Sequence, residues 1–258
     1  MKIKIQQSKL VEILDYLYVD GIFPFSIIST KGGKLMSSQA DKEGYAFRYA
    51  IFEGDYFKSI SKEEESVKID IEKIKKFINI RKPETILTLE YPSSKDENKL
   101  RISGENAHNH ITVTKLDKSE IMKGVPFKIT DGVPYINKGQ VALDTHFSIS
   151  RGSFKTVSDY ASAHGTEFFR FNIGKERKLE VRVGDIHALE DYTPYQPVCK
   201  IFQAKEDFDV TFTKGIKELA KTFHRDIDIR GRSNMPAWFS EVSQSHKFGV
   251  LLSPVKES

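Results

Sequence analysis

A pattern of strand, helix and strand occurs twice in this sequence, and it constrains the fold more than any other feature. The first copy covers residues 66–91 and the second covers residues 207–231, and each places a β-rich run directly before an amphipathic helix. The same order of elements recurs around each copy: strand, helix, several strands, strand-helix-strand, then two strands. A repeat this long indicates duplicated domains, because solenoid repeats have periods of about 20–50 residues. The 258 residues fit two α+β domains of ordinary size.

The first half is predicted to contain two helices and several strands. A strand over residues 1–5 precedes a helix from Lys9 to about Val19, with Ser8 as the expected N-cap and Gly21 at the end. One stripe of this helix is apolar: Leu10, Ile13, Leu14 and Leu17. The second helix has its own apolar face, Ile71, Ile74, Phe77 and Ile78, and is expected to stop at Pro83. Further strands are expected at residues 23–30, 34–38, 45–52, 85–91, 99–103 and 108–114, with a hairpin turn at Lys31-Gly32-Gly33.

The second half repeats this order after a connector. Residues 117–138 show neither helical nor strand periodicity and contain Gly124, Pro126, Gly132 and Pro134, so they are interpreted as an interdomain connector. This divides the chain into domain 1 (1–116), the connector (117–138) and domain 2 (139–258). Domain 2 is expected to have a helix over residues 151–164 that ends at Gly165, and a helix that buries Ile216, Leu219, Ala220 and Phe223. The expected strands cover residues 141–150, 167–173, 178–183, 237–242 and 247–252.

Motifs that carry catalytic or cofactor chemistry are missing. The sequence has no GxxxxGK[ST] phosphate loop and no GxGxxG dinucleotide loop, and its single cysteine, Cys199, forms no metal cluster. His108-Asn109-His110 spells the letters of a nuclease motif, but on a strand the two histidines only share one face. We therefore expect no enzyme activity, no catalytic residues, no metal and no cofactor. No run approaches the about 18–20 apolar residues of a membrane span, and no signal-peptide pattern is present, so an intracellular protein without membrane contact is expected.

Basic side chains recur on the polar faces of the predicted helices. The net charge is only +4, so their clustering matters more than their number. Cationic helix faces hold phosphates without reading bases, although a lysine face on a single helix is often only solvated. Recurrence in both halves favours DNA contact by eight side chains: Lys73, Lys76, Lys82, Arg151, Lys155, Lys214, Lys217 and Lys221.

At several points the chain resembles the PCNA family of DNA sliding clamps. The last residues, RSNMPAWFSEVSQSHKFGVLLSPVKES, look like the family's closing strands, which end in an aliphatic pair, a small residue and proline. ETILTLEY resembles the strand after the family's second helix, and SRGSFKTVSDYASAHG resembles the helix that opens its second domain. Gly124-Val125-Pro126 matches a step in the family's connector. A divergent archaeal or viral member fits these motifs, as does one subunit of a heterotrimer.

The resemblance implies an architecture. Helices would line a central hole, antiparallel sheets would lie outside, and three subunits would close a ring by pairing edge strands. The edges implied lie around residues 108–115 in one subunit and 178–183 in the next.

The resemblance also implies a groove for partner peptides beneath the connector. The matching positions are Val125, Pro126, Pro236, Leu251, Leu252 and Pro254, and the alternative for each is a place in the domain core. Several positions depart from the family, since Val11, Glu12, Tyr18 and Asp159 stand where many relatives are basic.

The function implied is that of a polymerase processivity factor that encircles duplex DNA without regard to sequence. Its partners would be DNA polymerase, other proteins with clamp-binding motifs, a clamp loader and further copies of itself in a trimer. The cytoplasm or nucleoid would be its location, or the nucleus in a eukaryote. Two alternatives stay open: a monomeric, clamp-like viral factor that grips DNA by charge, and a nuclease with an unrecognised site.

Overall fold

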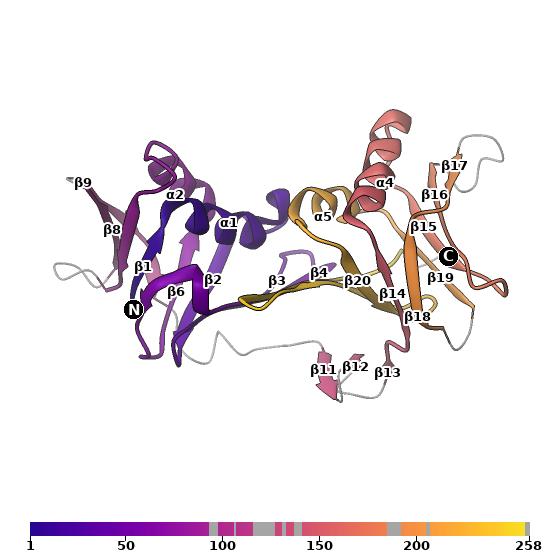
Figure 1. The fold of residues 1–258 in the computed structure, drawn as a ribbon, viewed down its shortest axis with the longest axis horizontal. Helices are drawn as coiled ribbons and strands as arrows, with labels where there is room; N and C mark the ends of the chain where they lie inside the picture. The colour runs from indigo at the N-terminus through magenta and orange to yellow at the C-terminus, as the bar shows by residue number, and fades with distance from the viewer. Residues whose placement is uncertain are drawn as a thin grey trace. The chain divides into compact units, whose positions relative to one another are not determined.

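The computed structural model describes residues 1–92, 98–105, 107–115, 127–130, 133–136, 141–184, 192–204 and 207–255. The chain divides into two compact units. Unit 1 comprises Met1–Ala40, Arg48–Val125 and Val242–Phe248, and unit 2 comprises Asp41–Phe47, Pro126–Glu241 and Gly249–Ser258. Among the described residues, each unit contains antiparallel sheets and two α-helices (Figure 1).

Unit 1 is built around two groups of strands. The first is a five-stranded sheet in the order β5 (Phe57–Ile60), β1 (Lys2–Gln6), β7 (Ile86–Glu90), β8 (Lys99–Gly104) and β9 (Ala107–Thr112). The second has the order β10 (Thr114–Lys115), β6 (Glu65–Asp70), β2 (Phe25–Lys31), β3 (Lys34–Ala40) and β4 (Ala46–Phe52). The predicted hairpin turn joins β2 to β3, where Gly32 and Gly33 both have positive φ. Two short 3-10 helices complete the unit, at Val19–Gly21 and Gly54–Tyr56.

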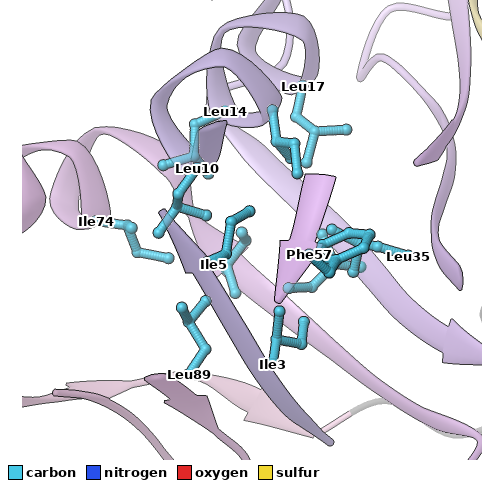
Figure 2. Close-up of a pocket in the computed structure, with 12 residues that line it drawn as sticks. Ile3, Ile5, Leu10, Leu14, Leu17, Leu35, Phe57, Ile74 and Leu89 are labelled. Carbon is cyan, nitrogen blue, oxygen red and sulfur yellow. The ribbon is translucent and has the colours of Figure 1, made fainter. Parts of the chain in front are cut away.

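The helices of unit 1, α1 (Gln7–Tyr18) and α2 (Ile71–Ile78), pack against each other and against these strands. Their apolar faces meet the side chains of β1 and β5, as Figure 2 shows for Leu10, Leu14, Ile74, Ile5 and Phe57. The space left between them is about 10 Å³, which is no more than a single water needs. This region is therefore a close-packed core that leaves no room for a ligand.

One predicted end of each helix in unit 1 is wrong: the start of α1 and the end of α2. α1 begins at Gln7, so Ser8 lies inside the helix and is not its N-cap. The first amides are satisfied by distant backbone instead, since Gln7 N donates to Thr85 O at 2.8 Å and Ser8 N donates to Pro83 O at 3.1 Å. α2 ends at Ile78, well before Pro83.

Unit 2 repeats the arrangement of two groups of strands. One is a four-stranded sheet in the order β17 (Tyr192–Tyr195), β16 (Leu179–Gly184), β15 (Phe169–Ile173) and β19 (Phe208–Phe212). The other runs β22 (His246–Leu252), β21 (Ala237–Val242), β20 (Ile227–Gly231), β14 (Thr145–Ile149) and β18 (Cys199–Gln203), of which residues 242 and 246–248 are assigned to unit 1. The edge expected at residues 178–183 is wrong, because β16 pairs with β15 on one side and β17 on the other. Among the described residues, the edge strands of this sheet are β17 and β19.

The helices of unit 2, α4 (Arg151–His164) and α5 (Ile216–Thr222), also pack against each other. The prediction for α4 is confirmed at both ends. The Ser150 side chain accepts a hydrogen bond from Ser153 N, and Gly165 adopts the left-handed conformation at the C-cap. α5 starts after Gly215, so Lys214 precedes the helix and does not lie on its face.

The predicted connector contains regular structure that its sequence did not indicate. β11 (Phe127–Thr130) and β12 (Val133–Ile136) form a hairpin, and β13 (Val141–Ala142) adds a third strand to it. The Gly124-Val125-Pro126 step lies outside the described residues.

Candidate nucleic-acid interface

Two cations are presented on the outer face of α2 in unit 1. Lys73 and Lys76 are both exposed, and Lys82 is exposed in the segment after the helix. Asp70 fixes the start of α2 by accepting a hydrogen bond from Lys73 N at 2.9 Å. Lys75 has a different role, because its Nζ lies 2.6 Å from Asp15 Oδ1 on α1 and joins the two helices.

The neighbouring face of α1 is not basic, as the departures from the family had indicated. Glu12 accepts a hydrogen bond from the Tyr56 hydroxyl at 2.6 Å and pairs with Lys9 at 3.0 Å. The Tyr18 hydroxyl donates to Glu72 Oε1 at 2.6 Å, and this hydrogen bond, together with burial, raises the pKa of Tyr18 to about 12. Tyr18 therefore remains a neutral donor over the whole physiological range.

In unit 2 the predicted cations fall on α4 and α5. Arg151 and Lys155 are exposed one turn apart on α4, and the next position on that stripe is the exposed Asp159. On α5, Lys221 is exposed and Lys217 is half-buried.

Lys214 is held elsewhere. Its Nζ pairs with Glu43 at 3.1 Å and lies 5.5 Å from the centre of the Tyr45 ring. This cation is already engaged within unit 2, and it is the weakest member of the predicted set.

Four exposed helix cations are available for phosphate contacts. Within the described ranges, Lys73, Lys76, Arg151 and Lys155 form no ion pair. Such side chains attract phosphate oxygens through charge and carry no base-reading geometry. The arrangement suits weak, sequence-independent contact with a nucleic-acid backbone.

The residues predicted to line a partner groove differ in exposure. Pro236 and Pro254 are half-buried, whereas Leu251 is 7% exposed and Leu252 is fully buried. The Leu252 side chain packs over Gly215, where an added Cβ would come within 2.9 Å of it. Leu252 therefore has a core role. Val125 and Pro126 lie outside the described residues.

Tyr45 also lies beside these C-terminal residues, although no sequence pattern indicated it. Its carbonyl accepts a hydrogen bond from Ser253 N at 2.8 Å, which places it beside the closing Leu-Leu-Ser-Pro segment. Burial, reinforced by nearby carboxylates that include Asp41 and Glu218, raises the pKa of Tyr45 to about 12. The sequence could not indicate this position of Tyr45, because residues 41–47 belong to unit 2 only through tertiary contacts.

Chemically reactive groups are not assembled into a site in the part of the chain that the structure describes. No group of three or more His, Cys, Asp or Glu side chains is placed to hold a metal ion there. His108 and His110 are exposed neighbours on β9, with ring centres 5.4 Å apart. Burial raises the pKa of the Cys199 thiol, which is the opposite of what a nucleophilic cysteine needs. None of the helices in these ranges is both long and apolar enough to cross a bilayer.

Two units, each with antiparallel sheets and two packed helices, define the DNA-clamp fold. Comparison with solved structures shows that the chain has the PCNA-type form of this fold. It is similar to the PCNA of A. fulgidus solved with the C-terminal region of FEN-1, with a TM-score of 0.75 and 17% identity over 100% of this chain and 99% of that one. The predicted α+β clamp fold is confirmed.

Two further PCNA structures match at similar quality. The protein from Thermococcus kodakaraensis gives a TM-score of 0.74 at 11% identity, covering 98% of this chain and 99% of its own. Proliferating Cellular Nuclear Antigen from Entamoeba histolytica gives a TM-score of 0.75 at 11% identity, covering 98% of each chain. No protein-family model and no curated protein sequence matches the chain. The likeness lies in the fold, with little sequence identity.

Proposed function

We propose that this protein is a non-enzymatic sliding clamp that encircles duplex DNA and tethers replication and repair proteins to it. The observation that carries the proposal is the PCNA-type fold over the whole chain, with exposed cations on helices of both units. Phosphate contacts of this kind give no sequence preference, which a protein that slides requires. The protein would act wherever DNA is replicated, in the nucleoid or in the nucleus.

Ring closure is proposed to pair two of the edge strands, β9 of one copy and β17 of the next. Among the described residues, β9 pairs only with β8 and β17 only with β16. Unpaired edges of this kind template the addition of another strand. Pro194 fits the edge position of β17 in the single chain, because proline has no N–H to donate. A strand added to β17 would find no donor at that one position, so the pairing would use the flanking residues.

Light scattering after size exclusion tests the assembly. A trimer has three times the chain mass of 29.5 kDa, and negative-stain images should show a ring with a central hole. A protein that stays monomeric at all concentrations and with any paralogue from its source contradicts the proposal. If such a monomer binds duplex DNA directly and loses it steeply with salt, it is the charge-gripping factor instead.

A comparison of circular with linear DNA tests whether the protein encircles the duplex. Protein loaded on nicked circular DNA by the loader of its source should remain bound during gel filtration and should run off once the circle is cut. Retention on linear DNA would contradict sliding. The loader itself is part of the proposal, because a closed ring must be opened to admit DNA.

The helix cations are tested by charge reversal in each unit. Lys76→Glu with Lys155→Glu should weaken duplex binding and lower the salt dependence by about two phosphate contacts. Lys62→Glu with Lys175→Glu is the matched control, because these exposed lysines lie in loops of unit 1 and unit 2 rather than on helices. Equal effects of the two pairs would remove the helices from the proposed interface.

The partner site is proposed to lie over Pro236 and Pro254, beside the Leu251 strand end. The A. fulgidus relative was solved with a FEN-1 segment, which shows that a PCNA of this fold binds a peptide from a partner. Pro236→Ser with Pro254→Ser should abolish polymerase stimulation and leave the trimer intact, since both prolines are only half-buried. Stimulation that survives in a folded trimer would place the site elsewhere.

A further inference from the structure

The solvent face of the five-stranded sheet in unit 1 carries an unusual concentration of positive charge. The register of β1, β7, β8 and β9 places Lys2, Glu90, Arg101 and His110 in one row across the sheet. The adjacent row contains Lys4, Thr88, Ser103 and His108. On the other side of the first row, Lys99 lies two residues before Arg101 on β8. These side chains alternate with buried residues such as Ile3, Leu89 and Ile102, so they share the outer face.

Among the described residues, Glu90 is the carboxylate that pairs with Lys2 and with Arg101. Glu90 lies 3.8 Å from Lys2 Nζ and 3.9 Å from Arg101 Nη1, at the long end of ion-pair distances. Lys4 is exposed and forms no ion pair within the described residues. His108 and His110 are exposed beside them. The face, named the basic sheet face and made of Lys2, Lys4, Arg101, His108 and His110, therefore has more positive charge from Lys2, Lys4 and Arg101 than Glu90 can pair with among the described residues.

The equivalent sheet of unit 2 provides an internal comparison. By element order, β14 and β20 correspond to β1 and β7. Their outer side chains include His146 opposite Arg230 and Ser148 opposite Asp228. His146 Nε2 lies 3.5 Å from Asp228, so charges there are interleaved. Lys200 lies opposite Ser148 on the same face, so unit 2 has two cations, Lys200 and Arg230, and one carboxylate there. The unit 1 face has one cation more, Lys2, Lys4 and Arg101, against the single carboxylate of Glu90.

We infer that the basic sheet face is a docking surface for an acidic, extended polypeptide segment of a partner protein. Side chains two residues apart on a strand are about 7 Å apart, and alternate carboxylates of an extended peptide have the same spacing. Lys2 with Lys4 presents cations at this repeat, and His108 with His110 presents hydrogen-bonding groups. The peptide can set its carboxylates on either side of Glu90.

Nucleic acid fits this face less well. The described positions in these rows hold no Phe, Tyr or Trp side chain on which a base could stack, as single-stranded nucleic acid prefers. A duplex would bring its continuous phosphate charge over Glu90, in the middle of the first row. In the proposed ring the face also stays open, because strand addition at β9 uses backbone groups and leaves the side chains on their faces. The inference does not depend on ring formation.

Fluorescence anisotropy with a labelled deca-glutamate peptide tests the docking surface. The variant Lys2→Gln, Lys4→Gln, Arg101→Gln should bind the peptide roughly tenfold more weakly, as expected for the loss of three exposed ion pairs. The matched control is Lys175→Gln, Lys178→Gln, Lys200→Gln, which removes the same charge from exposed positions of unit 2. It should change binding by less than about twofold. Thermal melting establishes that both variants fold, and Lys4→Glu alone replaces the triple variant if that one does not.

Three outcomes would overturn the inference. The first is no peptide binding at low ionic strength. The second is an equal loss in the two triple variants, which would mean general charge attraction. The third comes from a duplex and an oligothymidylate measured in parallel: if the sheet variant weakens either of them more than it weakens the peptide, the face is a nucleic-acid surface. Each result is independent of the trimer mass, so failure here is distinguishable from failure of the clamp proposal.

Discussion

Gly249 in β22 is covered by the indole ring of Trp238, so a single added methyl group is expected to destabilise unit 2. A Cβ placed on Gly249 lies 2.6 Å from Trp238 Cε2 and closer still to Cζ2 and Cη2, whereas ordinary contacts are 3.4–4 Å. Trp238 is only 7% exposed, so its ring has little room to withdraw. The ring or strand must shift by about 1 Å, and Gly249→Ala should cost about 3 kcal/mol of unfolding free energy, in the upper range for overpacked cores.

Urea unfolding measures this cost directly. Trp238 is the single tryptophan of the chain, so its fluorescence reports on the region that is perturbed. Gly152→Ala in α4 is the control, because a Cβ there meets no atom within 4 Å and should stabilise the helix by about 0.5–1 kcal/mol.

A double-mutant cycle identifies the cause. Trp238→Phe removes the atoms nearest to Gly249, so Gly249→Ala should cost at least about 1 kcal/mol less in the phenylalanine background, followed by circular dichroism. A Gly249→Ala protein within about 0.5 kcal/mol of the parent would refute the packing, and so would an equal cost in both backgrounds.

Three further predictions concern unfolding free energies. Asp70→Ala and Ser150→Ala should each cost about 1 kcal/mol in thermal melts, because each removes the side chain that caps a helix; no loss would mean that the caps contribute nothing. Burial raises the pKa of Tyr45 from 10.0 to about 12, so folding favours the neutral phenol. This contribution to the unfolding free energy is complete below pH 10 and is lost as the pH rises from 10 to 12. Tyr45→Phe should therefore reduce the loss of unfolding free energy over that pH range. Arg48 is fully buried and donates to the hydroxyls of Ser26 and Ser37, both at 2.8 Å, so Arg48→Ala should cost about 3 kcal/mol or more, and a neutral effect would contradict its burial.

Sequence periodicity predicted the helices best where both of their ends are encoded locally. α4 is flanked by a capping serine, Ser150, and by Gly165 in the left-handed conformation, and its bounds follow from those two residues. The start of α1 is different, because its first amides bond to the carbonyls of Pro83 and Thr85. A helix that is capped by a distant segment leaves no capping residue in its own sequence.

The short strands at the sheet edges could not be predicted from the sequence. β5, β17 and β18 were not predicted, since each has only four or five residues and pairs with one neighbouring strand. β17 even contains Pro194, which argues against a strand unless its edge position is known. Tertiary pairing creates these elements, and the edge proposed for ring closure could therefore not be located from the sequence.

The positions of the exposed helix cations were predictable from residue spacing, but the ion pairs that basic side chains form were not. Lys75 pairs with Asp15 and Lys214 pairs with Glu43, and both carboxylates come from segments remote in the sequence. The hydrogen bonds that Tyr56 donates to Glu12 and Tyr18 donates to Glu72 are equally non-local.

The placement of charge bears on how the proposed clamp would hold DNA. The helices offer few cations without ion pairs, and acidic or neutral residues such as Asp159 and Tyr18 stand among them. Affinity for duplex DNA grows with the number of phosphate contacts, so these helices would bind it weakly and lose it readily with salt. A closed ring does not need affinity to stay on DNA, because enclosure prevents dissociation, and weak contacts reduce the barrier to sliding. Excess charge is instead placed on the basic sheet face, where it would recruit a partner without slowing that movement.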